Sequence, residues 1–265
     1  MEPSTPAAAF SAAAPAYDRE FGELRAVRVL RRRAMEQILR HVPHGSRILE
    51  IGSGTGEDAL ALTGSGYRVT ATDVSPGMVA RAGARLEGTN VDLHVMDAAS
   101  LPSSFRPGSF DAIFSNFGAL NCVPGLPDLL PALAGLLRPG GTMILCLLGK
   151  YSVWEMAAGL FRLRPRFAFR RVHRGPVLAP VGGTFIPVWY HSIRSIRRAS
   201  RSCMRVAEIT GWSVLCPPPY ADRLNRTPSR FAALLEWLDR TWEGVPGLSR
   251  LGDHVVLVLR KHEAP

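Results

Sequence analysis

Three glycines at alternate positions directly follow a short apolar run over residues 47–51; they are Gly52, Gly54 and Gly56. The run is typical of a buried parallel strand, and the glycines let the backbone turn tightly and approach a ligand closely. A second run, residues 67–73, ends in the carboxylate of Asp73. At the carboxyl edge of a parallel sheet, such a carboxylate can accept hydrogen bonds from both hydroxyls of a ribose. These residues therefore predict a site for a nucleoside-containing cofactor.

The residues after the glycines narrow the choice of cofactor. The dinucleotide pattern G-x-G-x-x-G opens a helix toward a pyrophosphate, but Glu57 stands where the third glycine would be and Asp58 follows it. Two carboxylates at this place would repel a diphosphate. A cationic sulfonium without phosphates suits the loop better, and S-adenosylmethionine is the common cofactor of that description. The motif alone leaves an ordinary glycine-rich turn of an α/β protein as the alternative.

Further elements of an α/β protein follow in order. Ser75 is a predicted helix N-cap, with Pro76 at the first helical position. Residues 91–98 indicate a third strand that ends at Asp97, and residues 110–117 indicate a fourth. Residues 136–147 combine a helix end, a Pro-Gly-Gly turn and a fifth strand.

Together these motifs resemble class I S-adenosylmethionine-dependent methyltransferases over roughly residues 10–150. The motifs at residues 54–59, 71–78 and 116–123 resemble those of a bacterial "type 11" group of small-molecule methyltransferases. The resemblance implies an α/β fold: a Rossmann-like, doubly wound, mostly parallel seven-stranded sheet with a cap inserted after the fifth strand. It also implies S-adenosyl-L-methionine as cofactor and S-adenosyl-L-homocysteine as product.

For the activity, the resemblance implies methyl transfer to a small-molecule or lipid-like metabolite of natural-product or secondary-metabolite type. The alternative is a member that still binds the cofactor but uses it for scaffolding or for a different reaction. Neither the acceptor, the methylated atom nor the oligomeric state follows from the sequence.

The resemblance assigns cofactor binding to these residues: Tyr17, Glu50, Gly52, Ser53, Gly54, Gly56, Asp73, Val74, Met78, Asp97, Ala98, Asn116 and Phe117. The loop from 52 to 56 would present backbone to the methionine part, and Glu50 would brace the loop or reach the amino group. Asp73 would bind the ribose, and residues 74, 78, 97 and 98 would surround the adenine. Residues 116 and 117 would border the methyl group. Tyr17, in the motif Ala14–Asp18, would help to close the site. The alternative is that Tyr17 is an aromatic residue on the surface.

Methyl transfer from a sulfonium is an in-line displacement, which an apolar pocket assists with few dedicated groups. A hydroxyl or carbon-acid acceptor would gain from a general base. We predict Tyr190, His191 and His254 as the group from which a base would come; structural or solvated rings are the alternative. His191 follows the fifth strand in the variable region, and His254 opens the predicted last strand.

Residues 150–205 carry the whole excess of positive charge. The window holds Lys150 and eleven arginines against one acid, Glu155, whereas the rest of the chain has 20 basic and 21 acidic residues. Such a concentration suggests an anionic substrate, a membrane surface or nucleic acid. Residues 154–174 mix aromatics with arginines, so they are either a helical cap over the acceptor pocket or a peripheral membrane contact. Nucleic acid is a disfavoured partner, because residues 116–119 do not form the Asn-Pro-Pro-Tyr-type motif of base-modifying enzymes.

The predicted organisation is a flexible tail over 1–14, a cofactor-binding core with an N-terminal lid helix over 15–149, a basic insertion over 150–205, and a C-terminal part of the core over 206–265. An amphipathic helix is expected at 228–243 and an antiparallel last strand at 255–259. Pro217 to Tyr220 and Cys122 are candidates for lining the acceptor pocket. The four cysteines lack C-x-x-C spacing, so no metal site or disulfide is expected, and we expect a cytoplasmic protein with no membrane span.

Overall fold

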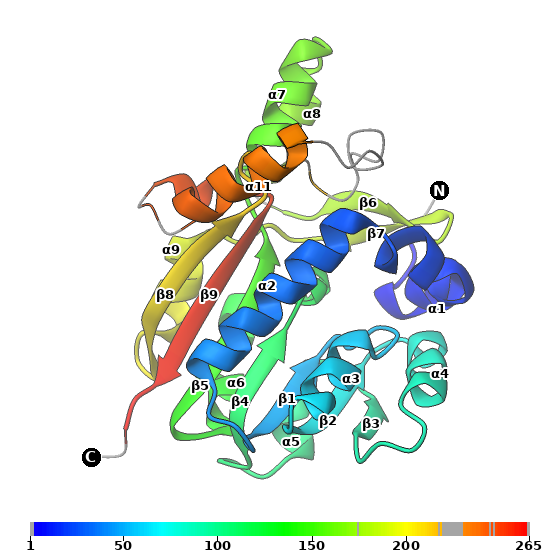
Figure 1. Cartoon of the computed structure of the whole chain (residues 1–265), viewed down its shortest axis with the longest axis vertical. Coiled ribbons are helices and arrows are strands. Elements are labelled where there is room, and N and C mark those ends of the chain that lie inside the picture. The colour runs from blue at the N-terminus through cyan, green and yellow to red at the C-terminus, as the bar shows by residue number, and fades with distance from the viewer. Residues whose placement is uncertain are drawn as a thin grey trace.

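The computed structural model describes residues 3–173, 175–216, 218, 230–243, 245 and 247–263. Its centre is a seven-stranded sheet in the order β3-β2-β1-β4-β5-β9-β8 (Figure 1). The first five strands are parallel, and β9 runs antiparallel to both β5 and β8. This arrangement confirms the predicted fold class. The strands are β1 (Arg47–Ile51), β2 (Arg68–Asp73), β3 (Asp92–Val95), β4 (Phe110–Ser115), β5 (Leu137–Leu148), β8 (Met204–Trp212) and β9 (His254–Lys261).

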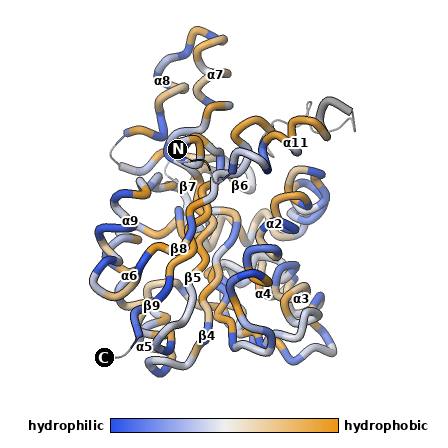
Figure 2. Tube along the Cα trace, turned by 60° about the vertical axis from the view of Figure 1, so that its left-hand side comes forward, coloured by the Kyte–Doolittle hydropathy of each residue, from blue (hydrophilic) through white to orange (hydrophobic). Residues whose placement is uncertain are grey.

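Helices cover both faces of the sheet (Figure 2). One face carries α2 (Arg25–His41), α3 (Glu57–Gly64) and α4 (Pro76–Arg85); the other carries α5 (Leu101–Ser104), α6 (Leu126–Gly135) and α9 (Ile193–Ser200). Successive residues of a strand point to opposite faces, so the central strands are apolar on both. In β1, Ile48 packs with Ile38 of α2, whereas Leu49 packs with Leu130 of α6.

The N-terminal segment corrects the expectation of a flexible tail over 1–14. Helix α1 spans Pro6–Tyr17 and a π-helical turn follows over Asp18–Gly22. The hydroxyl of Thr5 caps α1 by accepting from the Ala8 N–H at 3.2 Å. Ala9 and Ala14 are buried, and α1 contacts α4 and the hairpin of β6 (Val177–Val181) and β7 (Thr184–Val188). The alanine-rich sequence favours a helix, and its small side chains permit this close packing.

The segment after β5 forms α7 (Val153–Phe161), α8 (Pro165–Ala168), a 3-10 turn (Arg170–Val172), the β6–β7 hairpin and α9. Helices α7 and α8 project beyond the sheet (Figures 1 and 2). The predicted boundary between 205 and 206 falls inside β8, because the ladder with β9 already begins at Met204. The insertion therefore ends by supplying an edge strand of the core.

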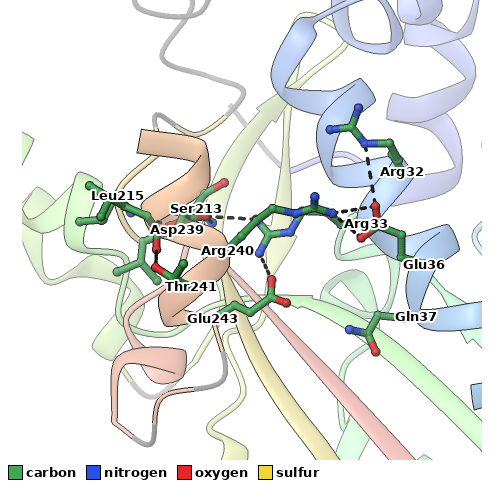
Figure 3. Close-up of polar contacts among 12 residues, drawn as sticks. Arg32, Arg33, Glu36, Gln37, Ser213, Leu215, Asp239, Arg240, Thr241 and Glu243 are labelled. Atoms are coloured by element: carbon green, nitrogen blue, oxygen red, sulfur yellow. Dashed lines mark hydrogen bonds and ion pairs between the residues drawn. The ribbon is translucent and has the colours of Figure 1, made fainter. Parts of the chain in front are cut away.

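Helix α11 (Arg230–Trp242) confirms the predicted C-terminal helix and lies beside α2 (Figure 3). Asp239 is fully buried; it accepts hydrogen bonds from the N–H groups of Ser213, Val214 and Leu215 and pairs with Arg33 of α2 at 3.1 Å. The candidates Pro217 and Tyr220 lie outside the described residues. In the part of the chain that the structure describes, no helix is long and apolar enough to cross a bilayer.

Candidate cofactor site

A cavity of about 520 Å³ opens at the carboxyl ends of β1, β2 and β4. It brings together eleven of the predicted cofactor residues: Tyr17, Gly52, Ser53, Gly54, Asp73, Val74, Met78, Asp97, Ala98, Asn116 and Phe117. The crossover topology explains this convergence, because the ends of parallel strands meet at one edge of the sheet. Glu50 and Gly56 do not line the cavity.

Asp73 holds the glycine loop while keeping capacity for a ligand. Its Oδ2 accepts from the Gly54 N–H and its Oδ1 from the Ser75 N–H, both at 2.8 Å. Burial raises the pKa of this carboxyl group, and the two N–H donors oppose that shift. Each carboxylate oxygen has a further lone pair, so a ribose diol can still donate to it.

At two positions of the loop, neighbouring side chains come so close to the backbone that only glycine fits. Gly52 has φ of +79°, and a Cβ there would lie 2.2 Å from Ala119 Cβ. Gly56, with φ of +80°, precedes α3, and a Cβ would lie 3.0 Å from Ala82 Cβ of α4. Gly56 therefore sets the packing of two helices rather than the surface of the cavity.

An arginine that sequence reasoning missed organises the acidic side of the cavity. Arg31 of α2 pairs with Glu57 at 2.8 Å and with Asp58 at 2.7 Å, and its guanidinium lies 5.1 Å from the Phe117 ring centre. Burial alone would lower the pKa of Arg31, but Asp58 and Glu57 raise it above its usual value. Asn116 donates to the Asp58 Oδ2 at 3.0 Å. Four lining carboxylates, at 57, 58, 73 and 97, thus face one arginine, which favours a cationic ligand.

Glu50 lies beneath the loop, with 1% of its surface exposed. Its Oε2 makes no hydrogen bond to a residue that the structure describes. Burial and the charge of Asp58 raise its pKa well above the ordinary value. The predicted contact between Glu50 and the cofactor amino group stays a prediction.

The opposite end of the cavity is suited to an adenine ring. Met78 is buried in the first turn of α4, whose N-terminus is capped by the Ser75 hydroxyl at 3.1 Å, as predicted. Val74, Met96 and Ala98 add apolar surface, while the exposed carboxylate of Asp97 lies at the rim. Strand β3 ends at Val95, so Asp97 lies in the following turn, where its Oδ1 accepts from the Ala99 N–H at 2.8 Å.

Aromatic rings close the side of the cavity next to α1. The Tyr17 ring lies 5.2 Å from that of Phe21, which lies 5.5 Å from that of Phe117. Burial raises the pKa of Tyr17, so its hydroxyl stays protonated. Phe117 has φ of +49°, a strained value for a side chain of this size, and strain of this kind is characteristic of functional sites. Sequence reasoning also missed Thr5, Pro6 and Phe10, which α1 brings to the cavity.

The structure does not bring the three predicted catalytic residues to this cavity. The His254 ring is buried behind Phe117, with ring centres 6.3 Å apart, and burial lowers its pKa. The Arg171 guanidinium lies 5.0 Å from the Tyr190 ring centre. His191 lines a different cavity. Their catalytic role stays a prediction. Cys122 does line the first cavity, and burial raises its pKa to about 11.

Comparison with known proteins identifies the domain. Residues 48–141 match the model of a methyltransferase domain. The chain is 36% identical over 154 residues to a demethylmenaquinone methyltransferase of Clavibacter sepedonicus, covering 55% of this chain and 58% of the relative. It is 36% identical over 108 residues to a ubiquinone biosynthesis O-methyltransferase of Xanthomonas campestris, covering 40% and 44%. The chain therefore spans about half the length of these curated relatives.

A solved S-adenosylmethionine-dependent methyltransferase from Mesorhizobium loti shares the fold, with a TM-score of 0.56 and 17% identity over 85% of this chain and 96% of that one. The fold, the glycine loop with its ribose-type carboxylate and the matched segment all agree with the resemblance seen in the sequence. Residues 48–141 thus match a methyltransferase domain, in a chain that has the fold of solved S-adenosylmethionine-dependent methyltransferases.

Proposed function

We propose that this protein transfers the methyl group of S-adenosylmethionine to a small, apolar or lipid-like acceptor. The observation that carries the proposal is the geometry of Asp73, which lines the cavity: its Oδ2 holds the glycine loop through Gly54, its Oδ1 accepts from Ser75, and each oxygen keeps a further lone pair. The excess of carboxylates over cations in the lining supports a cationic sulfonium. The names of the relatives support a small-molecule acceptor of quinone-precursor type.

The bound cofactor supplies a methyl carbon on a cationic sulfur; the bond to sulfur breaks as the bond to the acceptor atom forms, and the acceptor loses its proton. In this chain, Asp73 would orient the ribose, while Phe10, Tyr17 and Phe117 would exclude water from the reacting groups. An acceptor would enter past Pro6, Val123 and Pro124, which present apolar surface. The proposed acceptors include natural products. The proposal also places the protein in the cytoplasm, with residues 154–174 in contact with a membrane surface.

The proposal is tested by calorimetric titration with S-adenosylhomocysteine, followed by transfer of labelled methyl to short-chain demethylmenaquinone. Asp73→Asn keeps the shape of the side chain but replaces one acceptor oxygen by an amide donor. Loss of a charge-assisted hydrogen bond costs roughly 1.5–3 kcal/mol, so binding should weaken about 10- to 100-fold. Asp92→Asn, at the exposed start of β3, is the matched control and should bind normally.

Failure of the unaltered chain to bind S-adenosylhomocysteine would refute the proposed cofactor use. Binding without transfer to any acceptor would instead favour a member that keeps the cofactor for a different role.

A further inference from the structure

A second cavity, of about 1210 Å³, runs beside α9 on the edge of the molecule formed by β8 and β9. It shares no lining residue with the cofactor cavity. Its lining comes from α9, the end of β5, the start of β9 and the start of β8. We call it the α9 groove.

The walls of the α9 groove are basic. Six arginines line it: Arg194, Arg197, Arg198, Arg201, Arg205 and Arg250. Lys150 lines it as well, and among the described residues no Asp or Glu does. Six of the twelve basic residues of the insertion therefore line this one cavity.

These cations differ in their pairing from the arginines that stabilise the core and the cap. Ion pairs with N–O distances of 2.7–3.1 Å are made by Arg31, Arg33, Arg138 and Arg171. None of the six groove arginines, nor Lys150, makes an ion pair with any residue in the described part of the chain. Unpaired guanidinium groups that converge on a hollow can bind a phosphate or carboxylate through paired N–H donors.

The floor of the α9 groove is apolar. Its partly exposed apolar surface comes from Leu148 of β5, Val206 of β8 and Ile193 of α9; the other aliphatic lining residues are at most 5% exposed. A free inorganic anion would gain nothing from this surface, whereas an alkyl or isoprenoid chain would lose its contact with water on it.

His191 adds one polar group to the lining of the groove. Its Nε2 is buried without a hydrogen-bond partner among the described residues, and burial together with Lys150 lowers its pKa. The neutral ring can thus form a hydrogen bond with a ligand.

We propose that the α9 groove binds a single amphiphilic anion, a molecule with a phosphate or carboxylate head and a long apolar chain. The guanidinium groups hold the head, and the residues of the floor hold the chain. This function is separate from methyl transfer, since the groove and the cofactor cavity have no residue in common.

The test is calorimetric titration of the full chain with monomeric dodecyl phosphate, dodecyl maltoside and inorganic phosphate. The maltoside keeps the chain without the charge, and inorganic phosphate keeps the charge without the chain. Dodecyl phosphate should bind saturably with one molecule per chain, at least about tenfold more tightly than either of the others. Equal binding of inorganic phosphate would identify a simple anion site and overturn the proposal; equal binding of the maltoside would overturn it as well.

Variants locate the site. The triple change Arg197→Gln, Arg198→Gln and Arg201→Gln should weaken dodecyl phosphate binding by about tenfold or more. The matched control changes three exposed arginines elsewhere, Arg28→Gln, Arg68→Gln and Arg106→Gln, and should leave binding unchanged. Equal effects of the two triples would show binding by general charge and would contradict the groove.

S-adenosylhomocysteine binding, measured on the same samples, reports both folding and the cofactor site. It should be unchanged in the groove triple. If the triple fails to fold, the pair Arg194→Gln and Arg205→Gln, on the opposite walls, replaces it with the same expectation. If the unaltered chain does not bind S-adenosylhomocysteine, the proposed function is refuted, whereas the binding of dodecyl phosphate to the α9 groove is judged by its own titration.

Discussion

Glu50 shows how a single residue couples the loop of the cofactor site to the stability of the domain. It is buried beneath the loop, Asp58 and Asp73 add negative charge around it, and Arg31 compensates only in part. Because burial raises the pKa of Glu50, the folded chain holds a proton that the unfolded chain releases above the ordinary glutamate value of 4.5. Its contribution to stability is therefore fully present below that value and is lost as the pH rises through the raised folded pKa.

Replacing Glu50 by glutamine removes this titration. We expect Glu50→Gln to leave the free energy of unfolding near its original value at pH 4 and to raise it by about 1 kcal/mol or more at pH 8, since one pKa unit corresponds to about 1.4 kcal/mol. Urea denaturation of the cofactor-free chain across this range measures the difference. Glu87→Gln, at an exposed position, is the control and should follow the unaltered chain. An unchanged pH dependence in Glu50→Gln would contradict the buried, protonated state.

At the scale of residues, what could be predicted depended on how local the signal was. The glycine loop and Asp73 follow one another along two adjacent strands, so their spacing alone indicated that they meet. Arg31 carries no such signal, because it is one of several arginines in α2 and only the packing of that helix brings it to Glu57 and Asp58. The predicted catalytic histidines were chosen by residue type, and type says nothing about which side of the sheet a ring occupies.

At the scale of elements, α1 covers one side of the cofactor cavity and packs against a glycine of α4. The Gly77 N–H donates to the Ser11 Oγ at 3.2 Å, and a Cβ at position 77 would lie 2.8 Å from Ser11 Cα. Ser11 also exchanges a hydrogen bond with Ser75 at 2.8 Å. Because α1 brings Thr5, Phe10 and Tyr17 to the cavity, any displacement of α1 must open the site.

Gly77→Ala should therefore weaken S-adenosylhomocysteine binding by about tenfold, since it displaces α1 by steric conflict with backbone. Gly83→Ala, on the same helix, is the matched control, because the nearest atom to its Cβ would be Leu93 Cδ2 at 3.9 Å. Both changes gain similar helix propensity, about 0.5–1 kcal/mol, so only the contact with Ser11 distinguishes them. Calorimetric titration of both variants checks the prediction; equal affinities would show that α1 is not fixed by this contact.

The cap is held to the core by a buried ionic cluster. Glu155 of α7 pairs with Arg170 at 2.6 Å and with Arg171 at 2.9 Å, and Arg171 also pairs with Asp253, next to β9, at 2.9 Å. If Glu155 were neutral, the partly buried Arg170 would lose its carboxylate partner, while Arg171 would keep its pair with Asp253 but lose the one with Glu155.

Glu155→Gln should lower the free energy of unfolding by about 3 kcal/mol, within the usual range for breaking a buried pair. Hydrogen exchange over residues 153–172 should accelerate more than exchange in β1 and β4, because this cluster joins α7 and the 3-10 turn to Asp253 beside β9. Arg162→Gln, at an exposed cap position, should leave both quantities unchanged. Uniform acceleration across the sheet would mean that the cap does not open separately.

The order of elements was predictable because each crossover unit carries its own signals, such as the Ser75 cap and the Pro-Gly-Gly turn. Helix α1 was not, since an alanine-rich segment has helix propensity but no apolar periodicity until α4 and the β6–β7 hairpin provide surfaces on both sides. Its place in the fold is a property of tertiary packing.

At the scale of the whole molecule, α7 and the turn after it combine exposed apolar side chains with arginines. Helix α7 projects beyond the sheet (Figures 1 and 2). Phe161, the last residue of α7, is 90% exposed, and Leu163, in the turn that follows, is 89% exposed. Arg162, Arg164 and Arg166 alternate with them along the chain. Large apolar side chains that project into water beside arginines are suited to the interface of an anionic bilayer.

Phe161→Ser with Leu163→Ser should reduce cosedimentation with phosphatidylglycerol-containing vesicles by about tenfold or more, because both side chains lose the gain from leaving water. Pure phosphatidylcholine vesicles should bind the unaltered chain weakly, and added salt should weaken binding to the anionic ones. The control, Leu39→Ser with Leu60→Ser, removes two exposed leucines from α2 and α3 and should bind as the unaltered chain does. Equal loss in both double variants, or equal binding to neutral vesicles, would contradict a membrane role for the cap. Since the acceptor proposed for the cofactor site is apolar, a chain that docks by this tip would meet its acceptor at the membrane surface.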